Sequence, residues 1–227
     1  MSRFGGFGPN ALGFFKALAF HQSRDWFEAN RALYEEEARA PMMALIEDLA
    51  ERFAKEGLLL TGDGKRSLFR LNRDIRFSKD KSPYKTHLGA VMTRSGAKGE
   101  AGLLYLHISP EGCFVAAGFH LPEPAQLLMI RKTIQAKPAS YAAMNKALAK
   151  GKLRLGEDGA RLKRMPKGFE KHKDTPLADA FLRKSFIVEE ALAEKEILRP
   201  ALAGKIVNFA KRSAPLLDFG WAALGVA

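Results

Sequence analysis

The clearest structural signal in the chain is the stretch Leu103-Leu104-Tyr105-Leu106-His107-Ile108-Ser109-Pro110-Glu111-Gly112-Cys113-Phe114-Val115-Ala116-Ala117-Gly118-Phe119-His120. Two apolar runs flank Pro110-Glu111-Gly112, a combination typical of a hairpin turn. If Ile108 faces Cys113, one side of the hairpin is a core face of Leu104, Leu106, Ile108, Val115, Ala117 and Phe119. The other side mixes polar, small and aromatic residues, namely Tyr105, His107, Phe114, Ala116, Gly118 and His120. We expect this second side either to floor a cleft or to lie under helices.

Two further stretches before the hairpin alternate in the same way. Both are expected to be strands: residues 86–94 place Leu88, Ala90 and Met92 on one side, and in residues 68–72 Leu68, Arg70 and Asn72 alternate with Phe69 and Leu71. We expect 86–94 to pair with 103–109, which would place His87 on the side of His107 and His120.

Helical patterns occupy both ends of the chain. Asp25, followed three residues later by Glu28, resembles a capping box, and Pro41 predicts that the helix stops or kinks near Ala40. Gly57 is a natural terminator for the helix that follows. The expected helices are 10–19, 25–40, 41–55, 125–136, 138–150, 176–184, 200–212 and 216–224. The pattern predicts an α+β fold, with a central, mostly antiparallel sheet and N-terminal and C-terminal helical blocks packed against it. We expect one domain over 1–227, compact over 10–224, with an N-terminal loop at 1–9.

Charge and cysteine content restrict the possible environment and partners. Lys and Arg exceed Asp and Glu by 37 − 25 = 12. The stretch 65–98 holds ten basic and two acidic residues (10 − 2 = +8), and 146–173 holds ten and three (10 − 3 = +7). Such clusters attract nucleic acid or phosphorylated small molecules, although a basic solvated surface is the alternative. A single cysteine, Cys113, predicted to be buried and inert, favours a reducing, cytoplasmic location, and no apolar run is long enough to predict a membrane partner.

The polar chemistry is concentrated in residues 69–87, which read Phe69-Arg70-Leu71-Asn72-Arg73-Asp74-Ile75-Arg76-Phe77-Ser78-Lys79-Asp80-Lys81-Ser82-Pro83-Tyr84-Lys85-Thr86-His87. Guanidinium and ammonium groups suit phosphate oxygens, so the candidate anion-binding residues are Arg70, Arg73, Arg76, Lys79, Lys81 and Lys85. Asp74, Asp80 and His87 are candidate catalytic bases. The alternative for the two aspartates is that they form ion pairs that orient the arginines.

Other candidate residues lie outside this motif. His87, His107 and His120 are expected on one sheet face, where they could bind a metal or transfer protons, or could be ordinary hydrogen-bonded histidines. We assign no metal site, and the cofactor is unknown. Asn30, on an apolar helix stripe, and Tyr105 join His107 and His120 as cleft candidates. Arg131 lies on an apolar stripe and needs an anionic or carbonyl partner, and Lys163 and Arg164 belong to a second basic segment that either extends the anion surface or faces solvent.

Familiar catalytic and nucleotide-binding motifs are absent from the sequence. The stretch Gly62-Asp63-Gly64-Lys65-Arg66-Ser67 does not have the spacing of a phosphate-binding loop. The chain contains no Gly-x-Ser-x-Gly elbow, no His-Glu-x-x-His and no paired cysteines for zinc.

The motif at 69–87 resembles the signature of the domain-of-unknown-function family 2461. Supporting matches are Arg24-Asp25-Trp26-Phe27-Glu28-Ala29-Asn30-Arg31, Ala117-Gly118-Phe119-His120-Leu121-Pro122-Glu123-Pro124 and Leu162-Lys163-Arg164-Met165-Pro166-Lys167-Gly168-Phe169. The resemblance covers about residues 4 to 220 and departs at 171–176, which is more basic than the family pattern. It implies one domain and no assigned activity.

Three hypotheses about function follow from these residues. The first is a binding module for phosphate-bearing ligands, nucleic acid or nucleotide. The second is a hydrolase or phosphoryl-handling enzyme, in which Asp74, Asp80 or His87 acts and the arginines stabilise negative charge. The third is a structural ion-pair network within the motif.

Overall fold

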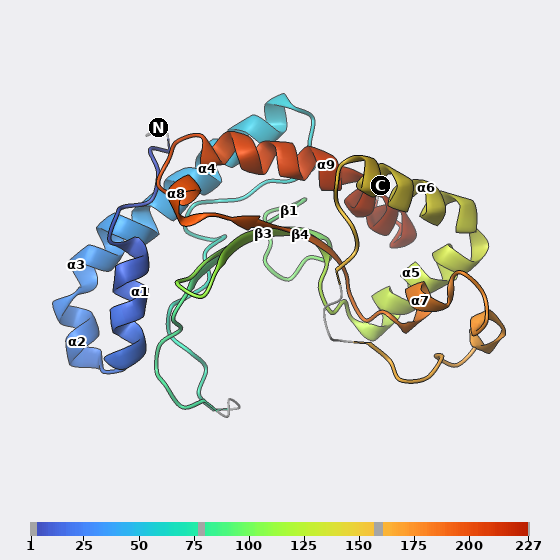
Figure 1. Cartoon of the computed structure of the whole chain (residues 1–227), viewed down its shortest axis with the longest axis horizontal. Coiled ribbons are helices and arrows are strands. Elements are labelled where there is room, and N and C mark those ends of the chain that lie inside the picture. Colours follow the sequence, from blue (N-terminus) through green and yellow to red (C-terminus); the bar gives the residue numbers. More distant parts are fainter. Residues whose placement is uncertain (1–3, 77–79, 157–160, 227) are drawn as a thin grey trace. The chain divides into compact units, whose positions relative to one another are not determined.

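A four-stranded sheet forms the centre of the fold (Figure 1). The computed structural model describes residues 4–76, 80–156 and 161–226. The strands β1 (Leu88–Thr93), β2 (Leu103–Ile108), β3 (Cys113–Phe119) and β4 (Phe186–Leu192) are antiparallel and follow the order β1-β2-β3-β4. Helices precede and follow the strands, so the predicted α+β class is confirmed.

Helices make up both ends of the chain, as expected. Before the sheet lie α1 (Ala11–Phe20), α2 (Arg24–Ala29), α3 (Arg31–Tyr34), the π-helical segment η1 (Glu35–Arg39) and α4 (Ala40–Lys55). Between β3 and β4 lie α5 (Pro124–Ala136), α6 (Pro138–Lys150), the 3-10 segment η2 (Glu170–His172) and α7 (Ala178–Leu182). After β4 follow α8 (Glu194–Ile197) and α9 (Leu202–Ala223). Among the described residues, no helix has the length and apolar character needed to cross a membrane.

The chain divides into two units that share the strands. Unit 1 comprises Met1–Glu100, Leu104–Val115 and Glu190–Phe209. Unit 2 comprises Ala101–Leu103, Ala116–Glu189 and Ala210–Ala227. The motif at 69–87 therefore belongs to unit 1, and the second basic segment belongs to unit 2.

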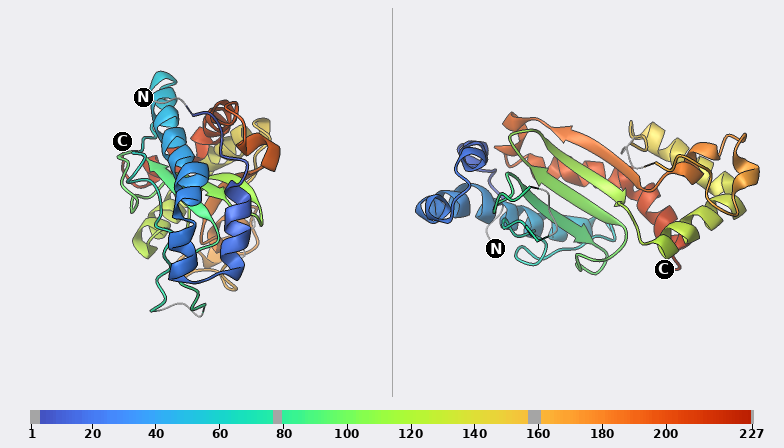
Figure 2. Two further views of the ribbon diagram at one scale, coloured as in Figure 1. Left: turned by 90° about the vertical axis from the view of Figure 1, so that its left-hand side faces the viewer. Right: turned by 90° about the horizontal axis from the view of Figure 1, so that it is seen from below.

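The two faces of the unit 1 strands differ in burial. Leu104, Leu106 and Ile108 of β2 are buried, while Tyr105 and His107 are half-buried. Helix α4 lies over one face of the strands, behind them in the right panel of Figure 2. Gly62 lies close to both Ile46 of α4 and Met92 of β1, so Met92 faces this helix. The part of the predicted core face that belongs to unit 1, with Leu104, Leu106 and Ile108, is therefore the face under α4.

Gly89 of β1 faces the opposite side, against Tyr105. A Cβ atom added at Gly89 would lie 2.7 Å from the Tyr105 hydroxyl oxygen. A side chain at residue 89 would therefore displace Tyr105.

Three predictions about the N-terminal half are corrected by the structure. The N-cap of α2 is Ser23, whose hydroxyl accepts from the Trp26 amide at 3.3 Å, and Asp25 lies within the helix. Pro41 does not end a helix, because the π-helical turn η1 leads directly into α4 and the Ala40 amide donates to the Glu35 carbonyl. Proline needs no amide partner in the first turn of α4. Residues 68–72 form only isolated bridges, Leu68 with Ala90 and Asn72 with Tyr84, and no strand.

Two predictions about the C-terminal half are also wrong. Strand β4 was not predicted, because Glu189 and Glu190 interrupt its apolar run, although Phe186, Val188 and Leu192 alternate and are buried. The expected helices 200–212 and 216–224 are one helix, α9, which continues through Pro215. Buried residues on both sides of this proline keep the helix in place against the usual cost of a lost backbone hydrogen bond.

Candidate functional site

The basic motif is a long loop whose two limbs are held together near its base. The Arg73 amide donates to the Pro83 carbonyl at 2.8 Å, and the Lys85 amide donates to the Leu71 carbonyl at 2.9 Å. Tyr84 fixes the loop to the helices, since its ring stacks on Phe27 at 4.8 Å and its amide donates to the Gln22 side chain at 3.0 Å. The limb that carries Lys85 is therefore well anchored.

Asp74 binds arginines near the tip of this loop. Its carboxylate accepts from Arg76 Nε at 3.0 Å and from Arg76 Nη2 at 2.8 Å, and Arg70 Nη2 lies 3.8 Å away. The Arg76 hydrogen bonds hold the pKa of Asp74 below its usual range. An exposed, ion-paired aspartate with a lowered pKa is a poor general base.

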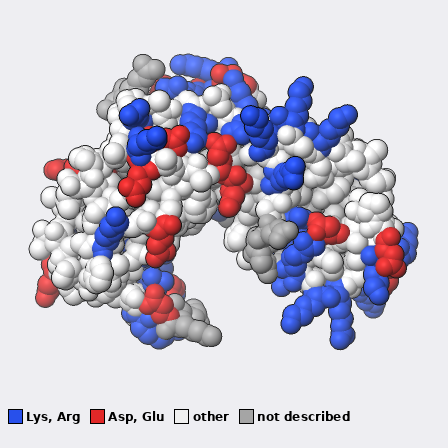
Figure 3. Space-filling view, viewed as in Figure 1, with Lys and Arg blue, Asp and Glu red and all other residues white. Residues whose placement is uncertain are grey.

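Asp80 has a comparable role on the other limb. It accepts from the amide and the hydroxyl of Ser82, which lowers its pKa, and it lies 3.0 Å from Arg73 Nη2. Lys81 donates to the Ile75 carbonyl at 2.8 Å. Figure 3 shows the resulting mixture of acidic and basic side chains at the tip of the loop. Lys79 lies outside the described residues. Much of the predicted positive charge is thus paired within the loop.

Lys85 differs from these cations. It is half-buried, with its Nζ atom 5.7 Å from the centre of the Phe69 ring. Burial, and then repulsion from Arg70, Arg73 and Lys98, lowers the pKa of Lys85. Within the described residues, no carboxylate pairs with its ammonium group. Arg73 and Arg70 have carboxylate partners in Asp80 and Asp74, so Lys85 is the cation of this group that lacks one among the described residues.

Lys98 and Arg73 complete the positive charge around Lys85. The ammonium group of Lys98 donates to the Leu68 carbonyl and lies 5.3 Å from the Phe69 ring centre. Arg73 is mostly buried, and among the described residues its Nε atom has no hydrogen-bond partner. Phe69 itself is 36% exposed. An exposed aromatic ring between two lysines is a surface on which an aromatic, anionic ligand can stack.

An imidazole pair adjoins these cations. The ring centres of His87 and His107 are 4.5 Å apart, and the Tyr105 hydroxyl forms a 3.1 Å hydrogen bond with Nδ1 of His107. Phe114 stacks on His107 at 4.7 Å. We call the set Phe69, Lys85, His87, Lys98, Tyr105, His107 and Phe114 the Lys85 cluster.

Both imidazoles of the Lys85 cluster favour the neutral form. Burial, followed by repulsion from Lys85 and Arg73, lowers the pKa of His87. Burial, with a contribution from His87, lowers the pKa of His107 to about 4. Neutral imidazoles at neutral pH can accept protons. No group of three or more His, Cys, Asp or Glu side chains suited to a metal ion occurs among the described residues.

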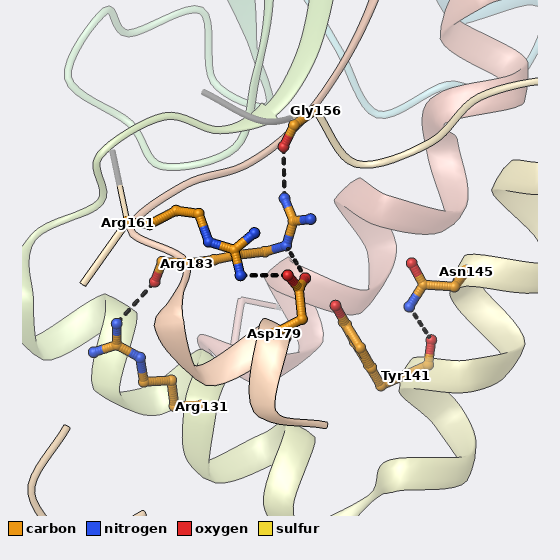
Figure 4. Close-up of polar contacts among 7 residues, drawn as sticks. All are labelled: Arg131, Tyr141, Asn145, Gly156, Arg161, Asp179 and Arg183. Carbon is orange, nitrogen blue, oxygen red and sulfur yellow. Dashed lines mark hydrogen bonds and ion pairs between the residues drawn. The ribbon is translucent and has the colours of Figure 1, made fainter. Parts of the chain in front are cut away.

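The candidates of unit 2 form a separate network, shown in Figure 4. Asp179 binds both Arg161 and Arg183, and Arg183 also donates to the Gly156 carbonyl at 2.6 Å. Burial opposes the effect, but the hydrogen bonds from the two arginines hold the pKa of Asp179 below its usual range. Arg131 is buried and donates to the Arg183 carbonyl at 2.8 Å, and burial lowers its pKa. Arg161 and Arg183 are thus paired internally, whereas the Nε atom of Arg131 has no hydrogen-bond partner among the described residues.

The remaining predicted residues have structural contacts or belong to unit 2. Asn30 donates to the Trp26 carbonyl at 2.9 Å and is the C-cap of α2. His120 is exposed and belongs to unit 2, as do the exposed Lys163 and Arg164.

Lys98 and Phe114 were not among the predicted site residues, whereas Phe69 belongs to the motif, where an aromatic ring can anchor the loop or stack on a base. Lys98 is distant in sequence from the motif, and only its place in the basic stretch 65–98 signalled a role.

The fold and the Lys85 cluster together define the class of protein. It is an α+β protein with an antiparallel sheet and a cluster of cationic and aromatic side chains in unit 1. Within this class the chain belongs to the family described as Conserved hypothetical protein (DUF2461), whose profile matches residues 10–219. This agrees with the resemblance noted in the sequence. No curated protein matches the chain, and no solved structure does so either.

Proposed function

We propose that the protein binds phosphate-bearing ligands, nucleotides or nucleic acid, through the Lys85 cluster and the neighbouring Arg73. The observation that carries this proposal is the half-buried ammonium group of Lys85, whose charged neighbours Arg70, Arg73 and Lys98 are all cations. Like charges held together by a fold repel one another, and a bound anion relieves that repulsion. The proposed site therefore uses only some of the cations of the motif at 69–87.

The aromatic members of the cluster favour a ligand that also carries a ring. Phe69 is partly exposed and lies between Lys85 and Lys98. A phosphate held by the lysines places an attached base near this ring, where stacking contributes about 1–3 kcal/mol per base in known single-strand-binding proteins. The neutral imidazoles His87 and His107 add hydrogen-bond donors and acceptors on the same face.

The test is calorimetric titration of the intact protein with pyrophosphate and with a short single-stranded oligonucleotide, at low and at physiological ionic strength. We expect affinity to fall as salt rises, and Lys85→Gln to weaken binding about tenfold. Arg76→Gln is the matched control, because the Arg76 side chain is 74% exposed and paired with Asp74. Binding that is insensitive to salt, or equal in the wild type and Lys85→Gln, would overturn the proposal.

A second candidate function is phosphoester hydrolysis with His87 as the base. The observation that favours it is the lowered pKa of His87, set by burial and by Lys85 and Arg73. Asp74 and Asp80 are poor candidates for the base in this hydrolysis, because each is paired with arginine. A screen with phosphomonoesters and phosphodiesters tests it, and turnover that persists in His87→Gln would exclude His87 as the base.

A further inference from the structure

We propose that Lys85 is an amine nucleophile that condenses with the carbonyl group of an anionic aldehyde or ketone, forming an imine. The inference rests on the proposed function, since the same cations would hold the negative group of such a ligand. It adds a covalent step to the proposed anion-binding site. It therefore names a substrate class, namely anionic aldehydes and ketones.

The position of Lys85 separates it from the other lysines near the loop. Its side chain is half-buried against Phe69, and its backbone is fixed by the hydrogen bond to Leu71. Lysines become nucleophilic when they are desolvated or placed beside other cations, because both effects favour the neutral amine. Lys81 and Lys98, by contrast, donate hydrogen bonds to the carbonyls of Ile75 and Leu68 and are exposed.

His87 is the candidate proton acceptor for this step. It follows Lys85 by two residues, and the charge of Lys85 acts directly on its imidazole. Its ring faces His107, whose Nδ1 atom is hydrogen-bonded to Tyr105. A neutral imidazole beside an amine can take up the proton that the nitrogen loses on attack and return it to the leaving oxygen.

The proposed step balances without an oxidant or a reductant. The Lys85 nitrogen attacks the carbonyl carbon, a C–N bond forms, and the carbonyl oxygen becomes a hydroxyl group after proton transfer. Loss of that hydroxyl as water, with the second proton of the amine, gives the C=N double bond. The products are one imine and one water from one amine and one carbonyl.

The probe is pyridoxal 5′-phosphate, which carries both an aldehyde and a phosphate. The intact protein is incubated with the probe, treated with sodium borohydride to fix any imine as a secondary amine, digested and analysed by mass spectrometry. We expect labelling at Lys85 to exceed labelling at Lys81 or Lys98 by about tenfold. Lys85→Arg keeps the charge but cannot form the imine, since guanidinium does not lose its proton in proteins. It should therefore lose the label at residue 85, while the low labelling of Lys81 and Lys98 stays as in the wild type.

Two outcomes separate this inference from the proposed function. Labelling that is spread over the lysines in proportion to their exposure overturns the inference. So does a total amount of label that is the same in Lys85→Arg as in the wild type. In both cases, pyrophosphate binding by the wild type would still support the proposed anion site. Absence of pyrophosphate binding to the wild type overturns the proposed function itself. Lys85→Met, checked by thermal unfolding, provides a second variant in case Lys85→Arg does not fold.

Discussion

The Lys85 cluster of unit 1 and the Asp179 network of unit 2 are both built from basic residues, but they use their charge differently. In unit 2, Asp179 pairs with Arg161 and Arg183, and the remaining guanidinium hydrogen bonds go to backbone carbonyls. In unit 1, the ammonium group of Lys85 lies among cations and against an aromatic ring. The first arrangement gives each of its arginines an internal carboxylate or carbonyl acceptor, whereas in the second no carboxylate among the described residues pairs with the ammonium group of Lys85.

The difference teaches that local net charge does not distinguish a site from a structural network. The stretches 65–98 and 146–173 carry nearly equal excess charge, +8 and +7 by count. The positions of the hydrogen-bond acceptors distinguish the two stretches, because a carboxylate or carbonyl within hydrogen-bond range of a cation offsets its charge locally. The following predictions test that distinction from the largest effect to the smallest.

Removing Arg183 should have the largest effect on stability. Arg183 is buried and joins Asp179 to the Gly156 carbonyl, so Arg183→Ala leaves this carbonyl without its donor and leaves Asp179 with Arg161 alone. We expect a loss of about 3 kcal/mol in the free energy of unfolding, measured by chemical denaturation. Lys163→Ala, at an exposed residue of the same unit, is the control. A stable Arg183→Ala that has lost anion binding would show that unit 2 also holds a ligand site.

Acid should destabilise the protein through the imidazoles of unit 1. The pKa of His107 is about 4 in the folded chain, below its ordinary value of 6.5, so the unfolded chain binds more protons between these pH values. Stability is therefore complete above about pH 6.5 and is lost as pH falls toward 4. After allowance for partial solvent screening, we expect this contribution to be about 1–2 kcal/mol.

His107→Phe tests the origin of this pH dependence. The substitution keeps an aromatic partner for Phe114 and removes the titrating ring. Denaturation of the wild type and the variant at pH 5 and pH 7.5 should show a smaller difference in the variant. Equal differences in both proteins would assign the acid sensitivity to other groups.

A side chain at Gly89 should disturb the Lys85 cluster with a moderate cost in stability. The Cβ atom of Gly89→Ala would lie 2.7 Å from the Tyr105 hydroxyl oxygen, so Tyr105 must move away from His107. We expect a destabilisation of about 1–2 kcal/mol and a change in the His107 titration followed by NMR. Gly99→Ala is the matched control, because nothing lies near the added atom. An unchanged His107 titration in Gly89→Ala would mean that Tyr105 does not position that imidazole.

The sequence predicted the hairpin, the helical ends and the face that carries His87, His107 and Tyr105, because alternation and turn residues act locally. It raised ion pairing of Asp74 and Asp80 with the arginines as an alternative, but not which arginine each would meet, since the conformation of the loop determines that. The sequence did not identify Lys98 as a site residue, because Lys98 is distant from Phe69 along the chain and approaches it only in the folded protein. Strand β4 was missed because Glu189 and Glu190 interrupt the alternation of apolar residues. In the structure, the burial of Phe186 and Val188 shows that alternation.

Arg76→Ala should have the smallest effect, although Arg76 lies in the centre of the basic motif. Its guanidinium is mostly exposed and forms two hydrogen bonds with Asp74, so the pair contributes little net charge to the Lys85 cluster. We expect pyrophosphate affinity to change by less than about twofold. Arg73→Ala, which removes a mostly buried cation close to Lys85 and His87, should weaken binding several-fold more. If calorimetry gave the reverse order, the anion would bind at the tip of the loop, and the charge of the motif rather than the unpaired ammonium of Lys85 would define the site.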